Sequence, residues 1–216
     1  MPEEKKFDRR SIRLRGADYS EPGAYFITIC AARHRDIFGK IENDRVALSP
    51  LGEIVRACWV EIPDHFASAS VQEFVVMPNH VHGIVGLTVG ARYIVPLDPK
   101  ARTPEKFQKP VKGSIPTIIR TFKGAVARRA RRELGVSCNE IWQRNYFERV
   151  LRDGKGYADA SRYILENRRR WEWDRENLER RMKPFDEKTV QHVWADFDAF
   201  RRAQATGVQA ASAAKP

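Results

Sequence analysis

Short stretches rich in β-branched and aromatic residues, each bounded by turn-forming residues, recur along the chain and predict strands. The predicted strands are 25–30, 45–48, 71–77, 80–87 and 141–152. Pro78 and Asn79 leave room only for a tight turn between two of these strands, and Asp153-Gly154 closes the last one.

Apolar residues spaced three and four positions apart predict the helices. One helix starts at the cap Ser49 and Pro50 and ends before Pro63. The others are 114–134, 155 to about 171, and a final amphipathic helix within 179–203. Gly135 is a suitable stop for the second helix.

The order of these elements predicts the fold. Leaving aside the short edge strand, the first six elements follow the order β-α-β-β-α-β, which is the split βαβ or ferredoxin-like arrangement. We therefore expect an α+β protein with an antiparallel sheet and helices on one face. A further helix that carries Tyr163 and an extra amphipathic helix would follow this core.

The domain organisation follows from changes in composition. Residues 1–10 are mostly charged and predict a mobile arm, and 11–178 form the main domain. Within it, 88–114 is rich in proline and basic residues and predicts a flexible loop. The helical extension 179–203 and a disordered tail, 204–216, complete the chain.

Composition adds a preference for partners. The 216 residues include 39 Lys and Arg against 28 Asp and Glu, a net charge of +11, which favours a polyanionic partner. With 42% hydrophobic residues the chain is too apolar to be wholly disordered. Neither a membrane-spanning run nor a signal peptide is visible, so a cytoplasmic protein is expected. Cys30, Cys58 and Cys138 are too far apart for a cysteine zinc motif.

Two histidines on one strand are the clearest candidate metal ligands. Side chains alternate between the faces of a strand, so His80 and His82 point the same way, as two imidazole ligands of one cation require. The alternative is a pair of strand histidines that bind nothing, and the spacing alone leaves both interpretations open.

Tyr163 and Asn167 form a second candidate pair. They lie four positions apart on a predicted helix and can address a single site. A phenol with a pKa near ~10 needs a metal or a base to act as a nucleophile at neutral pH. The alternative is a tyrosine that serves packing and an asparagine at the surface.

The predicted helix 114–134 is strongly basic on one side. Between Arg120 and Arg132 the chain has no acidic residue. The cations there are Arg120, Lys123, Arg128, Arg129, Arg131 and Arg132. This imbalance favours nucleic-acid binding over a solvated helix face, which is the alternative.

Several ordered motifs resemble a known family. They are RLRG followed by GAYFITIC, then VVMPNHVHGIV, IPTIIRTFK, IWQRNYF and RYILEN. Together they make most of residues 9–178 similar to HUH single-strand DNA transposases that use one tyrosine, and within them to REP-associated tyrosine transposases. Two positions depart from that pattern: Arg168 stands where a proline usually follows Asn167, and Arg149 stands where a histidine is expected.

The resemblance implies a function and assigns roles. Residues 11–178 would be an HUH nuclease and transposase domain acting on single-stranded hairpin DNA such as REP elements. His80, His82 and Asn167 would hold a divalent cation, while Tyr163 forms a 5′-phosphotyrosine link. Two imidazoles by themselves favour Zn²⁺, Ni²⁺ or Fe²⁺, whereas the resemblance implies Mg²⁺ or Mn²⁺, which we adopt.

The resemblance also implies how DNA is bound. The basic helix and loop would draw in the strand, Arg144 would contribute a further positive charge, and Trp142 would stack on an unpaired base. Two alternatives remain: a hairpin DNA- or RNA-binding protein without cleavage, and a nuclease that uses water instead of Tyr163. The sequence leaves open whether the chain acts as a monomer or a homodimer.

Overall fold

The computed structural model describes residues 21–88, 111, 113–137, 140–174 and 176–177. The predicted arm 1–10, most of the basic loop 88–114, the extension 179–203 and the tail 204–216 lie outside the described residues.

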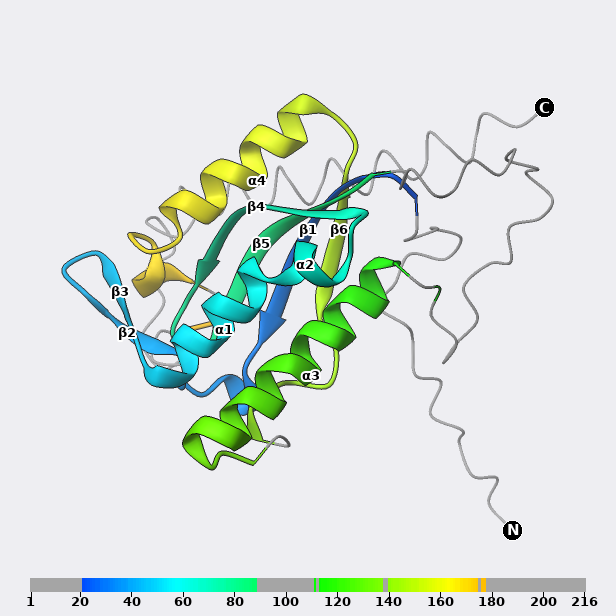
Figure 1. The fold of residues 1–216 in the computed structure, drawn as a ribbon. Coiled ribbons are helices and arrows are strands. Elements are labelled where there is room, and N and C mark those ends of the chain that lie inside the picture. The colour runs from blue at the N-terminus through cyan, green and yellow to red at the C-terminus, as the bar shows by residue number, and fades with distance from the viewer. Residues whose placement is uncertain (1–20, 89–110, 112, 138–139, 175, 178–216) are drawn as a thin grey trace, which may run out of the picture.

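A four-stranded antiparallel sheet forms the centre of the fold (Figure 1). Its strands are β1 (Gly23–Cys30), β4 (Ala69–Val76), β5 (His80–Leu87) and β6 (Phe147–Leu151). They lie in the order β4-β5-β1-β6, and each neighbouring pair is antiparallel. This is the strand order of the split βαβ arrangement, so the predicted α+β fold is confirmed.

Helices cover both faces of the sheet (Figure 1). On one face lie α1 (Pro50–Val60), the short α2 (Ile62–His65) and α3 (Ile115–Leu134), whose apolar residues pack with Ile27, Val81 and Val85. On the other face lies α4 (Gly154–Glu166), whose Ala160 and Ile164 pack on Phe26 and Ile84. Because strand side chains alternate, His80 and His82 share the face of Ile84 and lie on the α4 side.

The predicted helix boundaries at α1 and α3 are confirmed. Ser49 caps α1 and accepts a hydrogen bond from the Gly52 amide at 3.1 Å. At the other helix, Ser114 precedes α3, and Gly135 ends it in the left-handed conformation with φ of 67°.

Several elements differ from the predictions, among them the short helix α2, which was not predicted and contains Pro63. The strand predicted at 141–152 is shorter, because Trp142 forms only an isolated bridge with Ala31 and regular pairing begins at Phe147. The helix predicted to about 171 ends at Glu166, and a turn then leads into the 3₁₀ helix η3 (Trp171–Trp173).

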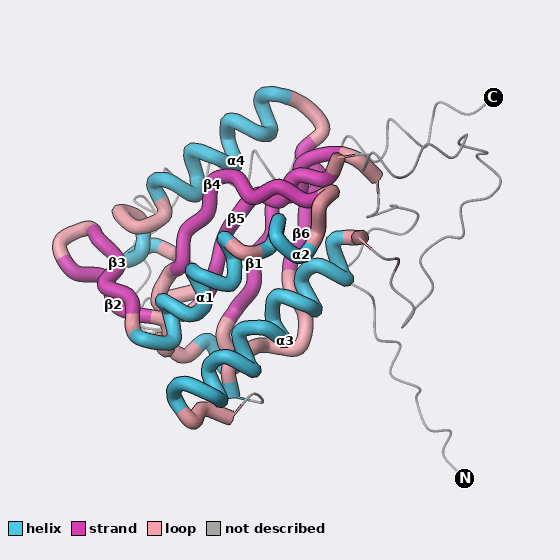
Figure 2. Tube along the Cα trace, in the orientation of Figure 1, coloured by secondary structure: helices cyan, strands magenta, loops and turns pink. Residues whose placement is uncertain are grey.

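Another difference is an additional strand. The edge strand β3 (Arg45–Leu48) pairs with β2 (Gly39–Glu42), which was not predicted, in a separate hairpin (Figure 2). Asn43 and Asp44 make the turn with φ of 49° and 59°, a conformation that Asn and Asp tolerate better than most residues.

Candidate active site

His80 and His82 lie side by side at the start of β5, with ring centroids 4.3 Å apart. Both are buried, with exposed fractions of 0% and 4%. The sheet register places them opposite Cys30 and Thr28 of β1. The prediction that the two imidazoles share one face is therefore confirmed.

Asn79 determines which nitrogen of His80 carries the proton. The Asn79 Nδ2 group donates to the His34 carbonyl at 3.1 Å and to the Glu176 carbonyl at 2.6 Å. Its Oδ1 atom lies 2.9 Å from His80 Nδ1 and can only accept, so the Nδ1 position is protonated. The lone pair of neutral His80 is then on Nε2, which is buried and has no hydrogen-bond partner within the described residues.

His82 bridges the sheet and the tyrosine. Its Nδ1 atom lies 2.8 Å from the Thr28 hydroxyl, and its Nε2 atom lies 3.4 Å from the Tyr163 hydroxyl. The Phe26 ring stacks on His82 with a centroid distance of 5.3 Å and meets the Tyr163 ring edge-on at 6.0 Å. These contacts hold the imidazole and the phenol together on the α4 face.

Asn167 lies directly after the end of α4 and is buried. Its Nδ2 group donates to Asp174 Oδ2 at 3.0 Å, which leaves Oδ1 as a buried acceptor without a hydrogen-bond partner in the described part of the chain. An amide oxygen in this state is suited to bind a cation.

Asp174 is the residue of this site that the sequence analysis missed. One ligand atom each of His80, His82 and Asp174 lies within 4.8 Å of the other two. Asp174 follows η3 and belongs to no periodic sequence pattern. The helix predicted to about residue 171 also covered the turn after Glu166, which brings Asp174 back to the histidines. Its proximity depends on tertiary structure alone.

Burial keeps both imidazoles neutral. Desolvation lowers the pKa of His80, although Asp174 and Glu176 partly oppose this effect. Desolvation lowers the pKa of His82 well below its usual value, and the neighbouring His80 adds to the shift. Neutral imidazoles carry the lone pair that a metal ion requires.

A second group of potential ligands lies beside this site, formed by Cys30, His34 and Glu176. Its members already bind one another: Glu176 lies 2.7 Å from His34 Nδ1 and accepts from the Cys30 thiol at 3.7 Å. Burial, together with the nearby Glu176 carboxylate, raises the pKa of Cys30 to about 12, so the thiol is neutral.

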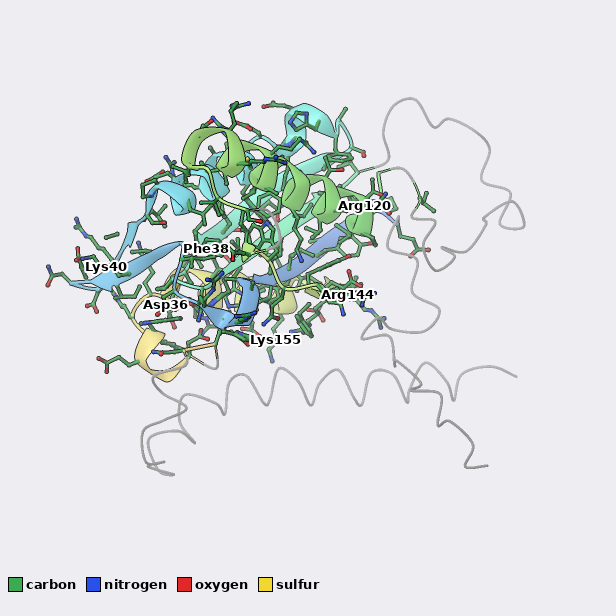
Figure 3. The ribbon with its side chains drawn as sticks, turned by 90° about the horizontal axis from the view of Figure 1, so that it is seen from below. Asp36, Phe38, Lys40, Arg120, Arg144 and Lys155 are labelled. Atoms are coloured by element: carbon green, nitrogen blue, oxygen red, sulfur yellow. The ribbon has the colours of Figure 1, made fainter. Side chains whose placement is uncertain are left out.

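The predicted DNA-binding residues of α3 lie across the sheet from the histidines. Arg120, Arg128 and Arg131 are exposed there. Arg129 binds Glu61 at 2.9 Å and Glu133 at 3.2 Å, and Arg132 binds Glu133 at 2.8 Å. Figure 3 shows Arg120 and the exposed Arg144 toward one end of the molecule and Lys40 toward the other.

Lys123 and Trp142, also predicted to bind DNA, make internal contacts. Lys123 Nζ donates to the carbonyls of Gln143 and Asn145, each at 2.8 Å, and burial lowers its pKa to about 8. Trp142 is half-buried against Phe38 and Phe122, with ring centroids 5.0 and 5.7 Å away.

A different basic group lies close to the site. Arg168 and Arg169, both exposed, directly follow Asn167 and line a hollow together with Asn43, Asp44 and Arg45 of the β2–β3 hairpin. Sequence periodicity gave no sign of this hollow, because it joins a hairpin tip to the end of a helix.

Comparison with known proteins identifies a relative. No family model matches the chain. An uncharacterized protein of Haemophilus influenzae is 39% identical over 166 residues, which are 77% of this chain and 91% of that protein. The chain belongs to the family of this protein.

Two solved structures are also similar. One is a REP-associated tyrosine transposase bound to a REP hairpin, with a TM-score of 0.49 and 18% identity over 75% of this chain and 76% of that chain. The other is a candidate transposase from Deinococcus radiodurans R1, with a TM-score of 0.40 and 16% identity over 72% of this chain and 98% of that chain.

Within the described residues, no helix has the length and apolar character needed to cross a membrane.

Proposed function

We propose that the chain is a REP-associated tyrosine transposase, an HUH enzyme that nicks and rejoins hairpin-bearing single-stranded DNA. One observation carries this proposal: the Tyr163 hydroxyl lies 3.4 Å from His82 Nε2. A potential nucleophile therefore lies beside the potential metal ligands, on the sheet face that the MPNHVH and RYILEN motifs share.

His80, His82 and Asn167 would hold the divalent cation, with Mg²⁺ or Mn²⁺ as the ions that the motif resemblance favours. The chain fits such an ion, because His80 Nε2 and Asn167 Oδ1 are buried acceptors without hydrogen-bond partners in the described residues. When bound, the cation would polarise the scissile phosphate and stabilise its developing negative charge.

Tyr163 would carry out the strand cleavage. Its oxygen attacks phosphorus, the bond from phosphorus to the 3′ oxygen breaks, and the phenol proton is released to solvent. The leaving strand takes up a proton and ends in a 3′-OH, while the other strand is linked to Tyr163 through its 5′ phosphate. A later attack by a 3′-OH breaks the phosphotyrosine bond and returns the proton to Tyr163.

The positive charge of the chain would hold the DNA. Arg120, Arg128 and Arg131 offer one exposed group on α3, and Arg168 and Arg169 offer another beside Asn167. Contacts to phosphates of this kind release counterions and make binding depend strongly on salt.

The proposed enzyme would work in the cytoplasm.

Tyr163 and His82 belong to the same chain, so one chain can supply both the nucleophile and the metal ligands. Use of these groups by a monomer is part of the proposal, and a homodimer remains a prediction to be measured.

The decisive experiment is a denaturing gel of the full chain with a hairpin-bearing single strand and Mn²⁺. Because the link is to a 5′ phosphate, a label at the 3′ end of the DNA should migrate with the protein, whereas a label at the 5′ end should leave on a shorter free strand. Binding without cleavage would indicate a hairpin-binding protein, and cleavage without an adduct would indicate a nuclease that uses water.

A further inference from the structure

A buried carboxylate faces the two histidines. Asp174 is 7% exposed, and its ligand atom and those of His80 and His82 lie within 4.8 Å of one another. We infer that Asp174 binds the divalent cation directly, together with His80 and His82. This inference rests on the cation site proposed above and assigns it a charged ligand.

Several hydrogen bonds hold Asp174 and Glu176 beside the proposed metal site. Asp174 Oδ1 accepts from the Glu176 amide at 2.7 Å, and Oδ2 accepts from Asn167 Nδ2 at 3.0 Å. The Glu176 carbonyl is in turn held by Asn79, the residue that also fixes His80. Each carboxylate oxygen keeps a second lone pair, so these bonds leave room for a metal ion.

Among the described residues, the groups that hydrogen-bond to Asp174 are neutral and do not balance its charge. Its two hydrogen-bond donors are a neutral amide side chain and a backbone N–H. No Lys or Arg in the described part of the chain forms an ion pair with it. Buried charges are usually paired or bound to metals, and a divalent cation between Asp174 and the histidines would supply the missing positive charge.

The neighbouring group of Cys30, His34 and Glu176 makes a useful contrast. There the carboxylate is 2.7 Å from an imidazole nitrogen and accepts from a thiol, so its members bind one another. Beside Asp174, by contrast, His80 Nε2 and Asn167 Oδ1 have no hydrogen-bond partner among the described residues, and His80 has no ion-pair contact there like that of His34 Nδ1 with Glu176. The unused lone pairs therefore assign the cation to the Asp174 side.

A carboxylate ligand would also suit the cations named in the proposed function. Two imidazoles alone favour Zn²⁺, Ni²⁺ or Fe²⁺, whereas carboxylate oxygens suit Mg²⁺ and Mn²⁺. With Asp174 added, the ligand set gains a negative charge and a hard oxygen. Asp174 would therefore adapt a histidine pair to the harder cations.

The test is binding of Mn²⁺ alone to the full chain, freed of metal and measured by titration calorimetry. Asp174→Asn is the informative variant, because it keeps an oxygen that can accept from Asn167 but removes the charge. We expect it to weaken Mn²⁺ binding by at least about tenfold and Zn²⁺ binding by less. Glu172→Gln, which neutralises an exposed carboxylate two positions away, is the matched control and should leave Mn²⁺ binding unchanged.

Thermal unfolding separates a ligand from a structural residue. Mn²⁺ should raise the Tm of the unchanged protein and should raise that of Asp174→Asn much less. Without metal, Asp174→Asn should be at least as stable as the unchanged protein, because it removes a buried charge. A structural role predicts the reverse, a lower Tm without metal; if Asp174→Asn fails to fold for any reason, Asp174→Ser provides the same comparison.

The outcomes distinguish this inference from the proposed function. His80→Ala should lose Mn²⁺ binding. If it does and Asp174→Asn still binds Mn²⁺ like the unchanged protein, Asp174 is not a ligand, although the proposed site stands. If His80→Ala also binds Mn²⁺ normally, the proposed cation site is itself wrong and the inference fails with it.

Discussion

The Tyr163 hydroxyl and His82 Nε2 are 3.4 Å apart, although 81 positions separate the two residues in the chain. The distance is short because α4 packs through Ala160 and Ile164 onto the sheet face that carries His82. The contact therefore depends on the same apolar packing that stabilises the fold. Substitutions that remove only the hydroxyl or an imidazole can test the chemical role of each group.

Replacing Tyr163 by Phe removes the hydroxyl and keeps the ring that packs on Phe26 and His82. We expect normal binding of hairpin DNA and no covalent adduct, because no other group at this position can bond to phosphorus. The measurement is the denaturing gel with DNA labelled at its 3′ end. Nicking that persists in this variant would favour water as the nucleophile.

Tyr146→Phe is the matched control. Tyr146 lies in the loop before β6 and packs with the cluster on the α1 and α3 face of the sheet, away from the histidines. We expect this variant to form the adduct. Peptide mass spectrometry should locate the DNA on Tyr163, and DNA on Tyr146 would refute the assignment.

Cation binding is tested by His80→Ala and His82→Ala. Each removes a buried imidazole from the site, so we expect cleavage to be lost while most DNA binding, which is mainly electrostatic, remains. Chelation with EDTA should have the same effect on the unchanged protein and be reversed by Mn²⁺. Unchanged cleavage in the double variant would contradict the site.

The two histidines also predict how stability depends on pH. In the unfolded chain each takes up a proton near pH ~6.5, whereas burial lowers the pKa of both in the folded state. Below about pH 7 the unfolded state therefore binds more protons, and the free energy of unfolding falls as the pH is lowered toward the folded pKa values.

Urea unfolding in EDTA at about pH 7.5, 6.5 and 5.5 measures this dependence. His82→Gln removes the imidazole whose pKa is lowered more strongly, so its stability should change less over this range. An equally steep decline in the variant would show that other groups cause the effect.

The sequence correctly predicted features that depend on neighbouring residues alone, such as helix ends and the face of a strand on which a side chain lies. Ser49 and Gly135 act at the ends of their own helices, and alternation along β5 is sufficient to place His80 and His82 on one face. The prediction of a strand from residue 141 was wrong, because alternating apolar residues do not show whether the backbone pairs with another strand. The carbonyls of Gln143 and Asn145 accept hydrogen bonds from Lys123 instead. Asp174 was missed for a related reason, since it reaches the site through a turn.

Gly83 provides a test of the packing behind the site. A Cβ atom there would collide with the Trp59 ring and lie 2.9 Å from Phe74 Cβ, so Gly83→Ala should lower the free energy of unfolding by about 1–3 kcal/mol. Gly124→Ala in α3 is the control, because its Cβ atom would meet only the movable end of Arg128 at 3.3 Å. That change should raise stability by about 0.5–1 kcal/mol, since alanine favours a helix. Equal effects of the two variants would contradict the packing argument.

Exposed arginines lie on α3 and beside Asn167, and the salt dependence of binding shows which of these groups contacts the DNA backbone. Each phosphate contact that is lost should reduce the slope of log K against log salt by about one unit. We expect Arg168→Gln with Arg169→Gln to weaken single-strand binding and flatten this slope, because the two residues lie beside Asn167.

Arg128→Gln with Arg131→Gln removes two exposed charges from α3, so the charge lost is the same on both faces. Extending this change to Arg129 and Arg132 would also break their ion pairs with Glu61 and Glu133, so the smaller variant is the cleaner test. A DNA strand that reaches Tyr163 and also contacts α3 must pass around an edge of the sheet, and the slope should then flatten in both double variants. If the slope is unchanged in the Arg128 and Arg131 double variant, α3 does not contact the DNA and its arginines are only solvated. The DNA would then bind on the sheet face that carries the histidines.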